Sequence, residues 1–319
     1  REYGVTAYQA GTALVKLVGF LNESKIAPKR LEWRNPISKP KELNRTDKET
    51  QEKRAKKLPD DLQLEAMAEM FANDLHNPRD RFTTSIFALL MCAPSRITEV
   101  QRLPLNVLHY DRDSKGIERL GLRFFGGKGA GWDIKYVTTS FVDIAEEAVR
   151  RLTELSAEGR RLARWYEENP SKFFRHSKCP NVDEHAPLSL AQVGLALGIP
   201  SLARTGSMSF FFKDYSPYEA LKKANKPITL AFLNGYCHSK LPEGFPYLDE
   251  ERQLKYSESL CCYRYHEFRQ DCATSPIRLW TPGKSLFTTD LNYVNGHEQS
   301  IWSRHGYRLS LIHISEPTR

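Results

Sequence analysis

The stretch Ile86–Leu105, IFALLMCAPSRITEVQRLPL, decides how we expect this chain to fold. It opens with an unbroken apolar run, Ile86 to Cys92, which is long enough for a helix buried on all sides and far too short to cross a membrane. Pro94 and Ser95 end the run, and Ser95 is a residue type that caps helices. The pattern predicts a buried helix, a turn, and a second helix that begins directly after Ser95.

Arg96 and Glu99 stand in the first turn of that second helix, ahead of the apolar residues Val100 and Leu103. Free backbone N–H groups and the helix dipole favour an anion at a helix N-terminus, and a guanidinium beside them adds a permanently charged clamp for a phosphate or carboxylate. Glu99 is spaced to hold the other side of Arg96. The same spacing also fits an ordinary surface ion pair, and spacing alone favours that interpretation.

The segment Ala93–Val100, APSRITEV, with the apolar helix before it and Leu103 after it, resembles the first arginine box of the tyrosine recombinase (phage integrase) family. In that family the arginine grips the scissile DNA phosphate, and the acidic residue supports the arginine. The resemblance implies these roles for Arg96 and Glu99. It also implies the fold class: mainly α-helical with a small β-sheet or hairpin, an α+β catalytic core that is incomplete here.

Length and composition place the chain among ordinary globular proteins. Its 319 residues are enough for one large or two modest domains, and 40% apolar residues are enough for packed cores. Lys and Arg exceed Asp and Glu by 47 to 39. The net charge of +8 suits a polyanionic partner such as double-stranded DNA, although many basic proteins bind none.

The cysteines indicate a reducing environment. Six occur without CxxC spacing, and we find neither a signal peptide nor a membrane-length apolar run, so we expect a cytoplasmic location. Two pairs raise the question of zinc, His176 with Cys179 and Cys237 with His238, but they lack zinc-finger spacing. We expect no metal and no cofactor.

Changes in composition predict the domain organisation. We expect residues 1–38 to be the tail of an N-terminal helical domain, 39–57 a charged linker, and 58–308 a catalytic domain with an insertion at about 186–255. Residues 309–319, LSLIHISEPTR, resemble the translation of an adapter used in preparing sequencing libraries, and we exclude them from the reasoning. Because the chain starts inside an expected helix and its own sequence would end in mid-domain, we expect a fragment that lacks parts at both ends.

The linker carries a run of basic residues, Lys53, Arg54, Lys56 and Lys57. In the resembled family a helical domain and a catalytic domain, joined by such a linker, form a clamp around the duplex. The resemblance therefore implies that these four residues track DNA phosphates. A solvated face of an exposed helix is an equally good interpretation.

The segment Leu120–Val137 predicts a β-hairpin, because apolar residues alternate on both arms around a glycine-rich tip. A lone lysine at such a tip usually serves solubility. After the arginine box, however, Gly127-Lys128-Gly129 resembles the family's hairpin lysine, which inserts toward the DNA and protonates the leaving 5′ oxygen. The resemblance implies this general-acid role for Lys128. The alternating residues are Leu120, Leu122 and Phe124 on the first arm and Trp132, Ile134 and Tyr136 on the second.

Three other amphipathic stretches predict helices, at about residues 8–21, 58–71 and 141–155. Leu188–Pro200 has the pattern of the start of a helix-turn-helix. No basic second helix follows cleanly, so we favour a small helical insertion there.

The remaining boxes of the resembled family are a His-x-x-Arg, then a His or Trp, then the nucleophilic tyrosine. His266 with Arg269, then His297, then Tyr307 match in order and rough spacing. The family's His-x-x-Arg opens a long buried helix, whereas residues 256–269 predict a helix that ends there. We therefore expect that the second arginine and the tyrosine are missing, and the alternative stays open.

The resemblance implies that the parent protein carries out site-specific DNA recombination or integration through a phosphotyrosine-linked intermediate. Its partners would be double-stranded DNA and further copies of itself in a synaptic assembly. We expect the present chain to bind DNA without cleaving it. The alternative is a non-catalytic helical DNA-binding or structural domain, in which Arg96 and Glu99 form a plain ion pair.

Overall fold

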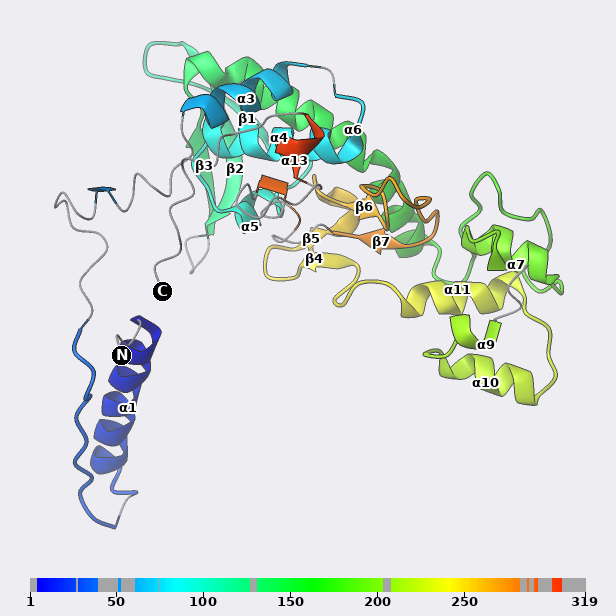
Figure 1. Ribbon diagram of the computed structural model, residues 1–319, viewed down its shortest axis with the longest axis horizontal. Helices are drawn as coiled ribbons and strands as arrows, with labels where there is room; N and C mark the ends of the chain where they lie inside the picture. The colour runs from blue at the N-terminus through cyan, green and yellow to red at the C-terminus, as the bar shows by residue number, and fades with distance from the viewer. Residues whose placement is uncertain are drawn as a thin grey trace. The chain divides into compact units, whose positions relative to one another are not determined.

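The computed structural model describes residues 5–26, 28–39, 51–52, 61–73, 75–126, 131–202, 208–281, 286, 290–291 and 300–305. These residues fall into two compact units, one up to Glu52 and one from Asp61 onward (Figure 1). No helix within these ranges is both long and apolar enough to cross a bilayer.

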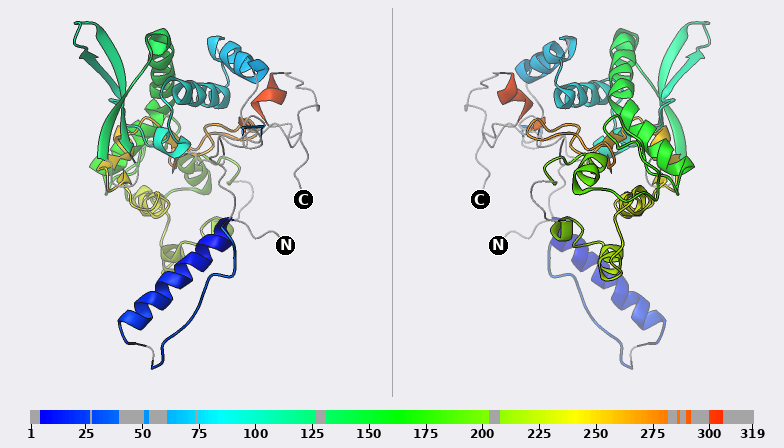
Figure 2. Two further views of the ribbon diagram at one scale, coloured as in Figure 1. Left: turned by 90° about the vertical axis from the view of Figure 1, so that its left-hand side faces the viewer. Right: turned by 90° about the vertical axis from the view of Figure 1, so that its right-hand side faces the viewer.

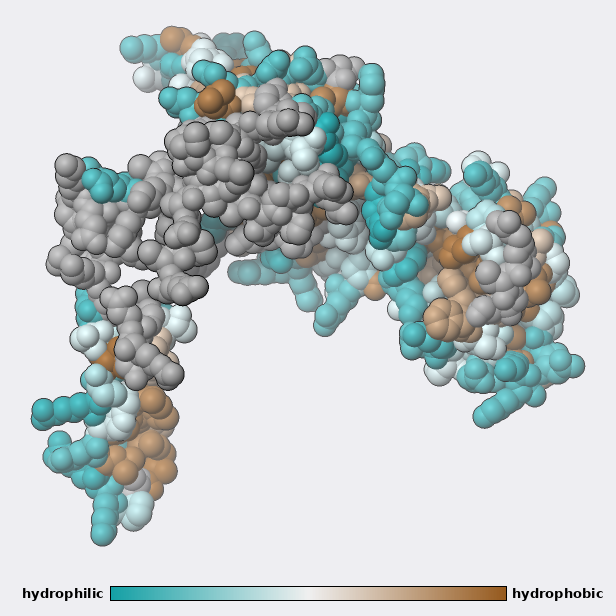
Figure 3. Space-filling model, viewed as in Figure 1, coloured by the Kyte–Doolittle hydropathy of each residue, from teal (hydrophilic) through white to brown (hydrophobic). Residues whose placement is uncertain are grey.

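The first unit is built on α1, Val5–Glu23, which is somewhat longer than the expected helix. An extended segment runs back along it and is held by two asparagines. Asn22 exchanges two hydrogen bonds of 2.9 Å with the backbone of Leu31, and Asn35 donates to the carbonyl of Tyr8 at 3.0 Å. One side of α1 presents exposed apolar side chains, seen as a brown stripe in Figure 3.

The second unit begins with two helices, α3 at Asp61–Ala72 and α4 at Pro78–Cys92. Asn77 caps α4, because its side chain accepts a hydrogen bond of 2.9 Å from the backbone of Arg79, and Pro78 fits the first turn, where no N–H is needed. The predicted apolar helix is thus confirmed. The expectation that it is buried on all sides is wrong, since Met91 is exposed on the side that α6 and α3 leave open.

The turn after α4 differs from the expected cap. Ser95 does not cap the next helix; its hydroxyl donates to the carbonyl of Ala93 at 2.8 Å. Arg96 is the N-cap residue, and its backbone N–H donates to Glu99 at 3.0 Å. Helix α5 spans only Ile97–Val100, a single turn, so a helix dipole contributes little here.

A three-stranded antiparallel sheet follows, in the order β1 (Leu108–Arg112), β2 (Glu118–Gly126) and β3 (Gly131–Tyr136). The expected hairpin is confirmed as β2 and β3, and β1 is an unforeseen third strand. Because successive side chains of a strand point to opposite sides, the sheet has two different faces. The inner face, with the buried Leu120, Leu122 and Phe124, packs into the core, and the outer face carries Arg123, Phe125, Trp132 and Ile134.

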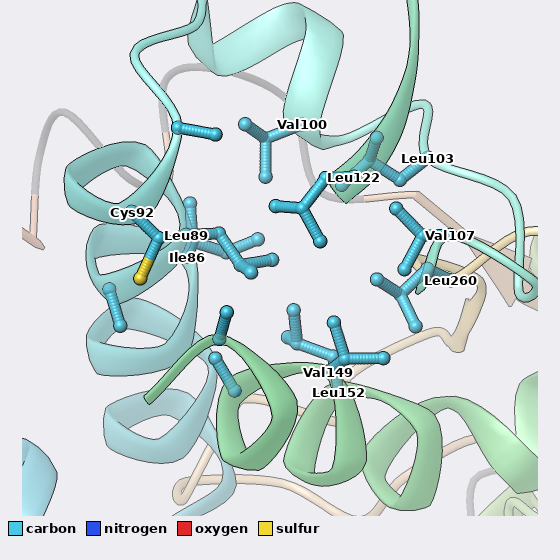
Figure 4. Close-up of a cluster of buried hydrophobic side chains, with 14 of the residues drawn as sticks. Ile86, Leu89, Cys92, Val100, Leu103, Val107, Leu122, Val149, Leu152 and Leu260 are labelled. Atoms are coloured by element: carbon cyan, nitrogen blue, oxygen red, sulfur yellow. The ribbon is translucent and has the colours of Figure 1, made fainter. Parts of the chain in front are cut away.

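Helix α6, Val142–Glu168, follows a 3₁₀ turn η1 at Thr139–Phe141 and runs 27 residues, well beyond the expected end at Leu155. It lies beside the sheet (Figure 2). Its first half joins α4 and the inner face of the sheet in one apolar core (Figure 4). The labelled members of that core in Figure 4 are Ile86, Leu89, Cys92, Val100, Leu103, Val107, Leu122, Val149, Leu152 and Leu260.

The second half of α6 belongs to another core, with Leu162, Ala163 and Tyr166 buried against four short helices. Rings gather there around Phe212, which stacks on Tyr218 at 4.9 Å between ring centres. This part of the chain is helical, as expected, and its being an insertion stays a prediction. Its helices are α7 (Leu190–Leu197), α9 (Met208–Phe211), α10 (Ser216–Lys223) and α11 (Leu230–Ser239).

The chain after the insertion is mostly irregular, with short strands. The helix expected at residues 256–269 is absent, because this segment pairs instead with the chain after α5: Leu260 donates to the carbonyl of Leu103 at 2.9 Å, and Leu105 donates to that of Glu258 at 2.8 Å. A short strand lies at Leu279–Trp280. The elements are β4 (Tyr247–Asp249), β5 (Leu254–Lys255), η2 (Tyr256–Glu258), β6 (Tyr263–Arg264) and β7 (Leu279–Trp280).

A buried ionic network joins the last helix, α13 at Ile301–Arg304, to the start of α4. Arg304 bridges the buried carboxylates of Asp80 and Asp290, and His305 reaches Asp80 at 2.8 Å. Removing one member of such a buried ion pair destabilises a fold strongly, because the partner is left buried and charged. The unit as a whole is an α+β fold of helices and small antiparallel sheets, as expected.

Gly159 lets α6 pass close to the chain at Cys262. A Cβ at this position would lie 2.3 Å from the carbonyl oxygen of Cys262, a backbone atom that cannot swing away. We predict that Gly159→Ala lowers the free energy of unfolding by about 1–3 kcal/mol, measured by urea denaturation. The control is Gly19→Ala on α1, where an added Cβ meets no atom within 4 Å and alanine favours the helix. Equal stability of both variants would show that the close crossing is wrong.

Candidate functional site

Arg96 stands at the N-terminus of α5 with 64% of its side chain exposed. One guanidinium nitrogen, Nη1, donates to Glu99 at 3.0 Å. Within the described part of the chain, the other guanidinium nitrogens make no hydrogen bond. The guanidinium is therefore oriented on one side and open on the other, which is the arrangement that binds an external anion.

Glu99 is held far more tightly than Arg96, with only 12% of its side chain exposed. Its two oxygens accept from the backbone and the side chain of Arg96. Burial acts to raise the pKa of this carboxyl, but the backbone hydrogen bond and the charges of Lys135 and Arg96 outweigh burial, so the pKa is lowered. Glu99 is thus an ionised, fixed support for Arg96.

Lys135 of β3 is a third member that the sequence reasoning missed. Its Nζ donates to the hydroxyl of Ser95 at 2.9 Å and to the carbonyl of Pro94 at 3.1 Å, and lies 3.6 Å from Glu99. It also stands 4.5 Å from the ring centre of Phe124. Lys135 therefore ties the sheet to the turn that carries Arg96.

A signal for Lys135 was present in the hairpin pattern. If Trp132, Ile134 and Tyr136 share one face of β3, then Lys135 must point to the other face, toward Leu122 of the core. A lysine at a core-facing strand position is unusual and implies an acceptor nearby.

Arg96, Glu99 and Lys135 together carry two positive charges and one negative charge. Lys135 keeps 33% of its side chain exposed, so both cations reach solvent. Such a cluster can bind one phosphate through a bidentate guanidinium contact, with an ammonium close by as a second charge or a proton donor. We name Arg96, Glu99 and Lys135 the arginine-box cluster.

Several predicted site residues lie outside the residues that the structure describes. These are Lys128 at the hairpin tip and the four linker residues Lys53, Arg54, Lys56 and Lys57. Their expected roles stay predictions.

The residues that match the later boxes of the resembled family occupy ordinary structural positions where they are described. His266 has a left-handed backbone, with φ of 68°, and its Nδ1 lies 3.2 Å from the sulfur of Cys272. Arg269 is exposed and paired with Asp271 two residues on. Neither opens a buried helix, and His297 and Tyr307 lie outside the described ranges.

The two histidine and cysteine pairs that raised the question of zinc serve as packing groups. His176 contacts the carbonyl of Ala196 at 2.9 Å, and burial raises the pKa of the Cys237 thiol to about 12. Over the described ranges, no three His, Cys, Asp or Glu side chains are grouped so as to hold a metal ion.

We compared the chain with protein-family models, with curated proteins and with solved structures, and none of the three comparisons gave a match. The resemblance of Arg96 and Glu99 to a tyrosine recombinase box therefore rests on the sequence motif alone.

The lowered pKa of Glu99 makes a pH-dependent contribution to stability. A carboxyl whose pKa is lower in the folded chain than in the unfolded chain stabilises the fold at pH values above its ordinary pKa of 4.5. This contribution is lost as the pH falls through the pKa of the folded chain. We predict that Glu99→Gln is less stable than the parent at pH 7, and that the difference shrinks below about pH 4.5. Urea denaturation at pH 7, 5, 4 and 3 measures it.

The control for this pH series is Glu168→Gln. Glu168 is exposed at the end of α6, and its side chain has no hydrogen bond or ion pair with other described residues. Its replacement should leave the free energy of unfolding at pH 7 unchanged. A difference between Glu99→Gln and the parent that stays constant from pH 7 to 3 would contradict the role given to the Glu99 charge.

Proposed function

We propose that this chain belongs to the catalytic core of a tyrosine recombinase and that Arg96 binds a backbone phosphate of double-stranded DNA. The single observation that supports this most is the state of Arg96: one nitrogen is held by an ionised Glu99 whose side chain is only 12% exposed, and the rest of the guanidinium is open to solvent. An arginine held in this way loses little conformational entropy when it binds a phosphate. The net positive charge of the chain supports the same partner.

Lys135 extends the proposal to a second cation. Its Nζ lies 3.6 Å from Glu99, the same carboxylate that holds Arg96, so Lys135 can contact the phosphate bound by Arg96 or the next phosphate along the strand. In the family that the motif resembles, a hairpin lysine protonates the leaving oxygen. Lys135 and Lys128 are both candidates for that role here, and Lys135 is the one with observed contacts to the turn.

In the parent protein, a tyrosine hydroxyl would attack the scissile phosphate and hold the 3′ end covalently, so that the strands can be exchanged among several copies bound to DNA. No metal or cofactor takes part in that scheme. The part played by Arg96 would be to stabilise negative charge on the phosphorane.

The competing proposal is a non-catalytic DNA-binding or structural domain in which Arg96 and Glu99 form an ordinary pair. Their spacing of three residues on a single exposed turn favours it, since such pairs are common and contribute little. The two proposals differ in whether DNA affinity depends on Arg96.

We predict that Arg96→Gln weakens binding to a labelled 30-base-pair duplex by about tenfold at low salt and reduces the slope of log affinity against log salt by about 1, because one phosphate contact is lost. Fluorescence anisotropy at several salt concentrations measures both. Arg150→Gln is the matched control. Arg150 is 54% exposed and pairs with Glu147 three residues away, and its replacement removes the same charge. Equal losses in both variants would favour the competing proposal.

We predict that the chain forms no covalent adduct with a nicked duplex. The sequence predicts that the second arginine and the nucleophilic tyrosine are missing, and His266 and Arg269 do not open a buried helix as the family's box does. Denaturing electrophoresis after incubation with labelled DNA is the readout. A band that survives denaturation and disappears on protease treatment would contradict the prediction and point to a tyrosine such as Tyr307.

A further inference from the structure

The outer face of the three-stranded sheet forms one wall of a cavity of about 910 Å³. Its lining includes His109, Arg123, Trp132 and Ile134 from the sheet, Arg252 from the turn between β4 and β5, and Arg164 from α6. The volume is in the range of pockets that hold small organic ligands. The cavity is distinct from the arginine-box cluster, because Lys135 points to the inner face of the same sheet.

Arg252 is the most buried of the three arginines, with 9% of its side chain exposed. Its guanidinium lies 4.6 Å from the ring centre of Phe125 on the outer face. Its Nε is 3.2 Å from Asp249, but without hydrogen-bond geometry, so this buried nitrogen has no hydrogen-bond partner among the described residues. Asp249 is shared, since Arg102 reaches it at 2.8 Å. One carboxylate thus serves two arginines.

Arg123 and Arg164 have no acidic partner in the described part of the chain. The Nη2 of Arg123 lies 3.4 Å from a ring nitrogen of His109, a long contact to a group that is itself basic. The side chain of Arg164 is exposed and has neither a hydrogen bond nor an ion pair with another described residue. Guanidiniums that converge on a cavity without acidic partners favour an anion inside it.

Two acidic residues also line the cavity: Glu258, and Asp133, whose position on β3 pairs with Phe124 of the inner face. Asp133 accepts a hydrogen bond of 2.8 Å from the backbone of Ile134, and neither carboxylate pairs with one of the three arginines. Three guanidiniums against two carboxylates leave the lining net positive, and the arginines keep their donors for a ligand.

The wall beside the arginines carries apolar and aromatic side chains. Trp132 packs edge-on against Phe125, with 5.4 Å between ring centres, and half of its side chain stays exposed. Ile134 lies next to it on the same face. An exposed indole held by a second ring is a surface on which a planar ring stacks.

From these contacts we propose that the outer face of the sheet binds a nucleotide, with its phosphate on Arg123, Arg164 and Arg252 and its base against Trp132. This site is independent of the DNA contact proposed at Arg96, because the two lie on opposite faces of the sheet.

Isothermal titration of the chain with adenosine monophosphate tests the site. We expect adenosine monophosphate to bind at least about tenfold more tightly than inorganic phosphate or adenosine, because each of these makes only one half of the contacts. Arg252→Gln should weaken binding by about tenfold or more, and Trp132→Ala by about five- to tenfold. Because Arg252 is buried, Arg164→Gln is the second variant; it changes an exposed side chain and should weaken binding by several-fold.

Two controls separate this site from the proposed DNA contact. Arg150→Gln and Arg96→Gln should both bind adenosine monophosphate as tightly as the parent. No binding of adenosine monophosphate, binding unchanged in Arg164→Gln and Arg252→Gln, or equal affinity for inorganic phosphate would each overturn the nucleotide site. A loss of DNA affinity in Arg96→Gln would not bear on the proposed nucleotide site.

Discussion

The packing of α4 against α6 is the contact on which the second unit depends. Ile86 and Leu89 of α4 meet Val149 and Leu152 of α6 beneath the inner face of the sheet, and all are buried. Each such side chain contributes about 1.5–3 kcal/mol through burial. Ala145 of α6 is fully buried as well, and so small a side chain lets the two helices approach closely. The turn from Ala93 to Arg96 leaves the end of α4, so this packing fixes where the arginine stands.

The arginine-box cluster then follows from two further contacts. Glu99 fixes Arg96 by accepting from its backbone and its side chain, and Lys135 joins the edge of the sheet to the same turn. The acid, Glu99, is the least exposed of the three side chains, and the two cations, Arg96 and Lys135, are more open to solvent. A site of this kind attracts anions, and it does so without relying on a helix dipole, since α5 is only one turn long.

The spacing of apolar residues predicted the elements that bury one face in the core: α4, the start of α6, and the hairpin of β2 and β3. It failed where tertiary contacts override local preference. Residues 256–269 have a helical pattern but pair with the chain after α5, because that pairing satisfies the backbone of both segments. In the site, Arg96 and Glu99 were predictable from spacing. Lys135 was predictable from the strand alternation, whereas the convergence of Arg123, Arg164 and Arg252 was not, since three distant segments supply them.

Helix α6 is shared between the two apolar cores of the second unit, its first half in one and its second half in the other. A helix held in this way cannot fray at either end without exposing apolar surface. Opening of one core therefore removes part of the packing that holds the helix in the other. Because apolar side chains of both cores cover the middle of α6, we expect its backbone amides to be among the slowest in the unit to exchange with solvent.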